Sequence, residues 1–163
     1  MSGSKSKRKW TNWLIPGIVF AILGMCVWST IWLYTPKQGV VDSFDDAPDA
    51  TFADLRHDGP IGFHSWKSYG GFGQNAIYRT DESSIRAWVR DNGGSITEMT
   101  AVFESLDEVI RDWLPAKVLD EFGYVPATLS VGDLQFGVEF GDYWGASGYF
   151  DIETGQAFLR SGD

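Results

Sequence analysis

The pattern of apolar and polar positions divides the chain at about residue 35. Residues 13–34 contain no Asp, Glu, Lys, Arg or His. At the rise of an α-helix, a stretch of this length is roughly 33 Å long, enough to cross the hydrocarbon core of a bilayer. The pattern therefore predicts a basic tail over 1–12, one membrane-spanning helix over 13–34, and a separate folded part after it.

Aromatic side chains lie at both ends of the expected span. Trp and Tyr favour the membrane–water interface, where the ring is apolar and its polar atom stays hydrated. Four basic residues precede the span, whereas only Lys37 follows it closely. This bias predicts a cell (inner) membrane protein with a cytoplasmic N-terminus and a periplasmic or extracellular C-terminal domain. The expected interface anchors are Trp10, Trp13, Trp28, Trp32 and Tyr34.

Two other interpretations of the apolar stretch are a cleaved signal peptide and a lipoprotein signal. Val27 and Ser29 can serve as small residues before a cleavage site, but the apolar run continues to Leu33. That length favours an uncleaved anchor. A lipoprotein signal would end at Cys26, where Met25 occupies a position that requires a small residue. Because Cys26 is the only cysteine, the chain forms no internal disulfide.

Residues 35–50 have little apolar periodicity and are rich in Pro, Gly and Asp. Such a composition is typical of a flexible linker that charge repulsion partly extends. The four acidic residues of this stretch lack the spacing of a calcium-binding loop. The sequence therefore predicts a linker over 35–50 and an exported domain over 51–163.

Helical periodicity appears in three places within 51–163. Ile85, Trp88 and Val89 share one helical face after a plausible N-cap at Asp81, which predicts a helix from Glu82 to Asp91. A second apolar stripe follows Ser105, with Trp113 expected to face a sheet. A third, shorter helix is expected over 118–122 and ends at Gly123. Residues 95–104 fit either a helix or irregular packing.

The last forty or so residues change to the alternating pattern of strands. Apolar and polar positions alternate over 134–140, and glycine-containing turns separate this run from its neighbours. Four strands are expected there, over 128–131, 134–140, 143–152 and 156–160, and earlier in the chain residues 76–79 form a short strand-like run. The sequence therefore predicts an α+β domain in which two or three helices pack on a C-terminal antiparallel meander of about four strands.

The charge distribution narrows the classes of partner. The chain has a net charge of −9, and the part beyond the apolar stretch has nine basic and 22 acidic residues, a net charge of −13. A domain this acidic repels phosphate-rich polymers and anionic lipid surfaces. We therefore expect no nucleic-acid partner and no contact between the domain and anionic headgroups.

The chain has few candidate catalytic or metal-binding groups. Its two histidines, His57 and His64, lie beside Asp58 and Ser65 in sequence, but adjacency does not assemble a catalytic site. A metal site normally takes three or more ligands, so only His57, His64 and Asp58 together are a conceivable set. We expect no cofactor and no metal. A small envelope enzyme that uses His57 or His64 with a carboxylate remains the alternative.

One glycine-rich segment concentrates aromatic residues. Phe63, Trp66, Tyr69 and Phe72 recur at every third position, and a left-handed extended segment with three residues per turn would place them on one edge. These rings are either a binding surface or part of the core. We expect a non-catalytic binding or assembly module that contacts a protein partner in the cell envelope. An accessory subunit of a larger membrane complex is a further alternative.

Overall fold

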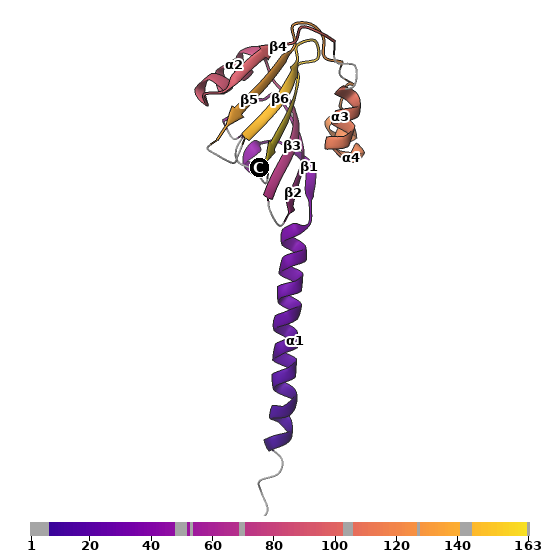
Figure 1. Ribbon diagram of the computed structural model, residues 1–163. Coiled ribbons are helices and arrows are strands. Elements are labelled where there is room, and N and C mark those ends of the chain that lie inside the picture. Colours follow the sequence, from indigo (N-terminus) through magenta and orange to yellow (C-terminus); the bar gives the residue numbers. More distant parts are fainter. Residues whose placement is uncertain are drawn as a thin grey trace, which may run out of the picture. The chain divides into compact units, whose positions relative to one another are not determined.

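The computed structural model describes residues 7–47, 52, 54–68, 71–102, 106–126, 128–140 and 145–162 (Figure 1). The chain forms two compact units, Met1–Thr35 and Pro36–Asp163. The first unit consists of helix α1, Lys7–Tyr34. The second unit contains a large antiparallel sheet with helices on it, which confirms the α+β class.

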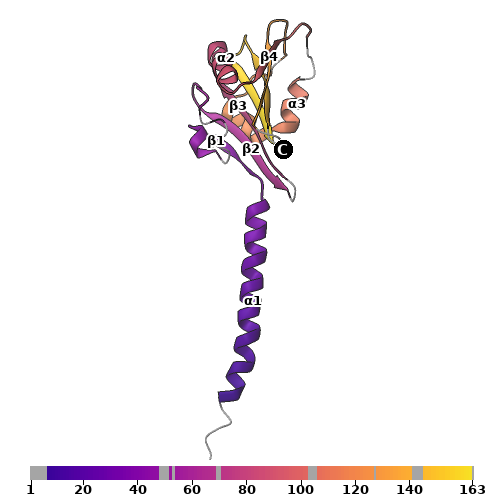
Figure 2. The same cartoon turned by 60° about the vertical axis from the view of Figure 1, so that its left-hand side comes forward.

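Helix α1 is continuous (Figure 2) and contains Pro16. Its described side chains, from Ile15 to Tyr34, are exposed. The part from Ile15 to Tyr34 is long and apolar enough to cross a membrane by length and composition, a property shared by membrane anchors and N-terminal signal sequences. No other helix in the described part of the chain has this property.

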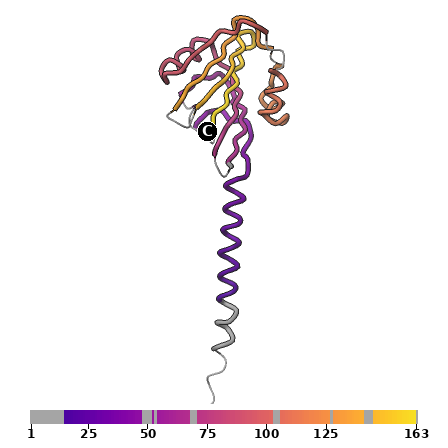
Figure 3. The backbone as a smooth tube through the Cα atoms, in the orientation of Figure 1, coloured from indigo at the N-terminus to yellow at the C-terminus, as the bar shows by residue number. Residues whose placement is uncertain are grey.

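The second unit is built on a seven-stranded sheet in the order β1-β2-β3-β7-β6-β5-β4, with every neighbouring pair antiparallel. Figure 3 shows the last three strands, orange to yellow, running side by side. The strands are β1 Lys37–Val41, β2 Ile61–Ser68, β3 Gly71–Arg79, β4 Ser95–Glu98, β5 Leu134–Glu139, β6 Gly145–Asp151 and β7 Gln156–Gly162.

The predicted count of about four strands was wrong. Strands β5, β6 and β7 lie within the expected C-terminal ranges, but residues 128–131 form no strand. Four strands come instead from earlier parts of the chain, where the alternating pattern is weak. In the glycine-rich hairpin of β2 and β3, the pairing continues in unbroken register from Gly62–Ile77 to Ser68–Gly71, so the glycines do not interrupt the strands.

The stretch expected to be a linker contains ordered structure. Residues Lys37–Val41 form the edge strand β1, which pairs with β2, and a short 3₁₀ helix, η1, follows at Phe44–Asp46. The Phe44 side chain is almost fully buried. Only Thr35 and Pro36 separate α1 from β1. The expectation of a flexible tether therefore fails for residues 37–46, because an exposed edge strand needs only one apolar face to join a sheet.

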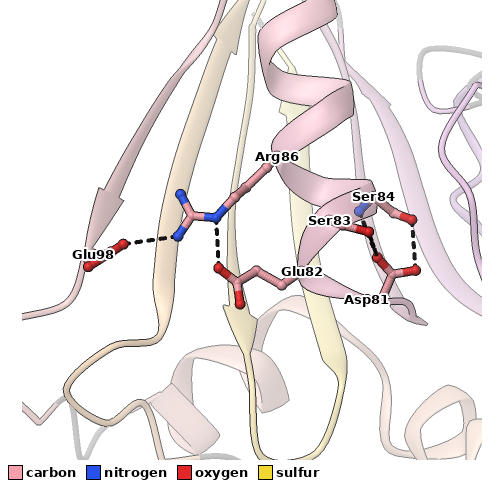
Figure 4. A network of polar contacts seen from close by, with 6 residues as sticks. All are labelled: Asp81, Glu82, Ser83, Ser84, Arg86 and Glu98. Atoms are coloured by element: carbon pink, nitrogen blue, oxygen red, sulfur yellow. Dashed lines mark hydrogen bonds and ion pairs between the residues drawn. The ribbon is translucent and has the colours of Figure 1, made fainter.

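The helices of the second unit agree well with their sequence signals. Helix α2 spans Glu82–Asp91, and the Asp81 carboxylate accepts a hydrogen bond from the Ser84 amide at 2.8 Å (Figure 4). Helix α3 spans Leu106–Trp113; the Ser105 expected to cap it lies outside the described residues. Helix α4 spans Ala116–Phe122 and ends at Gly123, whose φ of +73° is the left-handed conformation expected there.

The sheet carries separate apolar clusters on its two faces, with α2 and α3 on opposite sides (Figures 1 and 2). On the first face, α2 and the segment around Phe44 and Phe52 pack on the sheet. On the second face, α3 and α4 pack on Ile77 of β3 and Phe158 of β7. Helix α4 lies over β1 and β2. Tyr149 of β6 also packs against this cluster. Among the described residues, Gly73, Gly145 and Gly162 at the other end of this face belong to neither apolar cluster.

Candidate binding trough on the second face

At the glycine-rich end of the second face, the pairing of the strands decides which residues lie side by side. Residues paired directly across neighbouring strands point to the same face. The last row of the sheet pairs Glu139 with Gly145, Gly145 with Gly162, Gly162 with Gly73, and Gly73 with Trp66. Three glycines from three adjacent strands thus lie in line, between a carboxylate at one side and an indole at the other.

The neighbouring row adds polar side chains. It pairs Gly137 with Ser147, Ser147 with Arg160, Arg160 with Asn75, and Asn75 with His64. Both rows contribute to the lining of a hollow of about 610 Å³, within the usual size range of ligand sites, although Gly73, Asn75 and His64 do not line it. We call this hollow the glycine trough. The residues used below to define it are Trp66, Gly137, Glu139, Gly145, Ser147, Arg160 and Gly162.

Trp66 forms one side of the trough and depends on a glycine beneath it. A Cβ atom built on Gly73 would lie 2.3 Å from Cζ2 of the Trp66 indole, so the ring occupies the space that any other side chain would need. The indole is half-buried. Gly73 therefore fixes the ring flat against the sheet and keeps its remaining surface at the trough.

Arg160 provides the cation of the trough. Its guanidinium carbon lies 5.9 Å from the ring centroid of Trp66 and 5.6 Å from that of Trp113, within cation–π range of both. Arg160 is exposed, and no carboxylate in the described part of the chain lies within ion-pair distance of it. The guanidinium is thus positioned by two indoles and leaves its N–H groups available to a ligand.

Helix α3 ends above this row, and two side chains of the sheet meet its last carbonyl. The Asn75 amide group donates a hydrogen bond of 2.9 Å to the Trp113 carbonyl oxygen, and Nδ1 of His64 lies 3.3 Å from the same oxygen. These contacts satisfy an otherwise free C-terminal carbonyl of α3. His64 therefore has a structural contact at the helix end, and Trp113 is half-buried rather than fully in the core.

The predicted aromatic set is divided between the two faces. Phe63 points to the first face, where only 7% of its surface is exposed, so it belongs to the interior. Trp66 points to the second face and lines the trough. Phe72, next to Gly73 in β3, points to the first face, although it borders the end of the trough. Tyr69 lies outside the described residues. The proposed left-handed extended segment was wrong, because positions three apart in a strand point to opposite faces.

The two histidines lie in separate environments. The His57 ring is 5.3 Å from Phe44, at the apolar cluster of the first face, and its Nδ1 is 2.9 Å from the Gly59 carbonyl oxygen. His64 lies on the second face beside Trp66 and Trp113. Within the described residues, no group of three or more His, Cys, Asp or Glu side chains is arranged to hold a metal ion. The structure thus does not bring His57 and His64 together.

The sequence analysis missed Arg160, Glu139 and the two glycines that lie between them, Gly145 and Gly162, which we call the glycine floor. Their positions along the chain are far apart, and only the register of β3, β5, β6 and β7 brings them together. A usable signal was present, because Gly137, Gly145 and Gly162 all fall in or beside strands, where glycine costs stability and often marks a close approach. No protein-family model, curated protein or solved structure matches this chain.

Proposed function

We propose that the protein is a membrane-anchored, non-catalytic binding module of the cell envelope whose ligand lies in the glycine trough. The observation that carries this proposal is the pair of charged groups across the glycine floor. Arg160 and Glu139 both line the trough, and neither has an ion-pair partner among the described residues. A ligand with complementary groups would meet both without displacing an existing contact.

The composition of the trough supports binding rather than chemistry. Its aromatic, hydroxyl, guanidinium and carboxylate groups can orient a ligand, but His64 is directed to the end of α3 and His57 lies by the other face. General acid–base work needs a titratable group within hydrogen-bond reach of the reacting atom. Glu139 alone, on an exposed strand position, lacks the second group that such a mechanism needs.

We propose that α1 is an uncleaved anchor with a cytoplasmic N-terminus. The stretch from Ile15 to Tyr34 is long and apolar enough to cross a bilayer. Basic residues precede this stretch, and only Lys37 follows it closely.

Native mass spectrometry of the full-length protein, extracted from its own membranes in mild detergent, tests this function. A bound species should appear on the wild type and on Arg90→Gln, a control whose arginine is exposed on α2 and outside the trough. The same species should be lost from Arg160→Gln and from Trp66→Ala. A species retained by all four proteins, or absent from the wild type, would contradict the proposal.

A further inference from the structure

We infer that the trough binds a short oligosaccharide that carries one carboxylate, as in a neutral oligosaccharide with a single hexuronic acid unit. This inference rests on the proposed function and adds the chemical class of the ligand. It follows from the kind of groups in the trough, their separation across the sheet, and the backbone chemistry of the floor.

Arg160 selects for a carboxylate. Its planar guanidinium can donate two parallel hydrogen bonds to one carboxylate, and the indoles of Trp66 and Trp113 restrain it in place. The rest of the domain is strongly acidic, with a net charge of −13 beyond the apolar stretch. A single cation in such a field favours a ligand with isolated negative charges over a phosphate-rich polymer.

The groups beside Arg160 suit a sugar ring. A pyranose presents an apolar face of C–H groups, which packs against aromatic rings, and a rim of hydroxyl groups, which both donate and accept hydrogen bonds. Trp66 supplies the aromatic surface next to the cation. Ser147, which pairs with Arg160 across the strands, and Glu139, two strands from Arg160, supply partners for hydroxyl groups.

The span of the trough calls for more than one sugar unit. Strands β5 and β7 are separated by two interstrand spacings, so Glu139 and Arg160 arise from backbones roughly 10 Å apart. Between them, Gly145 and Gly162 carry no side chains, so an extended ligand can lie across the strands in contact with the sheet backbone. A ligand that reaches both charged groups is therefore an oligomer.

The floor disfavours a peptide as the occupant. At the trough, Gly145 of β6 and Gly162 of β7 pair with neighbouring strands on both sides, whereas Glu139 of β5 lies beyond the pairing of β5 with β4, which ends at Gly137. A peptide lying across β6 and β7 would find no free ladder positions there for its own N–H and C=O groups, which are costly to bury unpaired. A saccharide has no backbone amides along its chain, and its hydroxyl groups can use the side chains and water instead.

The test is titration of the full-length protein in detergent micelles with three probes, followed by calorimetry. The probes are a trisaccharide with one terminal glucuronic acid unit and two neutral units, the same trisaccharide with its carboxyl group reduced to a hydroxymethyl group, and a hexapeptide with a free C-terminal carboxylate. We expect the acidic trisaccharide to bind at least tenfold more tightly than its reduced form, since a charge-assisted bidentate contact commonly contributes that much. Arg160→Gln should remove this preference, and Arg160→Lys should restore only part of it.

Matched variants show whether a loss of binding comes from a changed ligand preference or from unfolding of the domain. Arg90→Gln should bind like the wild type, and all variants should melt at the wild-type temperature, because Arg90 and Arg160 are both exposed. Equal binding of the acidic and reduced trisaccharides would overturn the inference. Binding of the peptide alone, lost in Arg160→Gln, would overturn the saccharide class but leave the proposed function intact. No binding by any probe would also overturn the inference, and native mass spectrometry would then decide the proposed function separately.

Discussion

The indole of Trp66 lies over Gly73, its direct partner on the neighbouring strand, in space that a Cβ atom on Gly73 would fill. This pair connects the local sequence to the candidate site. Because the glycine has no side chain, the indole lies against β3, and its outer surface is available beside Arg160. The geometry of the trough thus depends on a residue that does not itself line it.

Substitution of Gly73 should disturb the trough specifically. In Gly73→Ala the new methyl group would overlap the Trp66 ring, so the indole must move, and the melting temperature should fall by several degrees. Gly137→Ala is the matched control, because a Cβ there comes no closer than 3.9 Å to its nearest neighbour. Circular dichroism melts of both variants measure the difference. Equal melting temperatures would show that Trp66 does not need Gly73.

A second prediction concerns Tyr78, which is fully buried on the first face and packs edge-on against Phe44. Its hydroxyl group has no hydrogen-bond partner among the residues that the structure describes. Removing it in Tyr78→Phe should raise the free energy of unfolding by about 1 kcal/mol, because a buried polar group without a partner costs about 1–3 kcal/mol. Tyr124→Phe is the control, since it removes a hydroxyl that donates to Asp107 at 2.6 Å and should destabilise the domain. Chemical denaturation of both variants tests the contrast.

The same tyrosine should give the domain a sensitivity to alkali. Burial raises the pKa of Tyr78 well above its ordinary value. In the unfolded chain a tyrosine ionises near pH 10, so above this pH the unfolded state is favoured by losing a proton that the folded state retains. The free energy of unfolding should therefore decrease above about pH 10, and less steeply in Tyr78→Phe. If the free energy of unfolding decreases equally with pH in the wild type and in Tyr78→Phe, Tyr78 is not the source of the sensitivity to alkali.

A fourth prediction uses the N-cap of α2. Hydrogen bonds from the Ser83 hydroxyl, and then from the amide and hydroxyl of Ser84, lower the pKa of Asp81 to about 2 from 3.8 (Figure 4). Because the folded-state pKa is depressed, the stabilisation is present above about pH 4 and is lost as the pH falls toward 2. Asp81→Asn retains a capping oxygen but cannot titrate, so its melting temperature should change less over this range than that of the wild type. If the melting temperatures of the two proteins fall equally as the pH is lowered, Asp81 makes no contribution.

The fold was predictable where its determinants are local. All the signals for α2, from the Asp81 cap to Val89, lie within one short segment, and the structure confirms them. Strand β1 was missed because its stability comes from pairing with β2, about 24 residues later in the chain, and not from its own composition. Phe63 and Trp66 were grouped by spacing, whereas the strand that contains them directs them to opposite faces.

The candidate site was only partly predictable for the same reason. Trp66 and Phe72 were identified from the sequence because they are close together in a distinctive segment. Nothing in the sequence around Arg160 and Glu139 marks them as site residues. Only the pairing of the strands places them beside the glycine floor. A single sequence specifies such long-range register only weakly, because each strand's pattern fixes its faces but not its neighbours.

Photo-crosslinking in intact cells tests most directly whether the trough is a binding site. A photoreactive phenylalanine analogue at Ser147, exposed within the trough, should form an adduct with the ligand of the full-length protein in its membrane. The same analogue at Lys117, exposed on α4 away from the trough, is the control. We predict an adduct from position 147 that Arg160→Gln abolishes, and none from position 117. The absence of an adduct at 147, or the same adduct at both positions, would contradict the account.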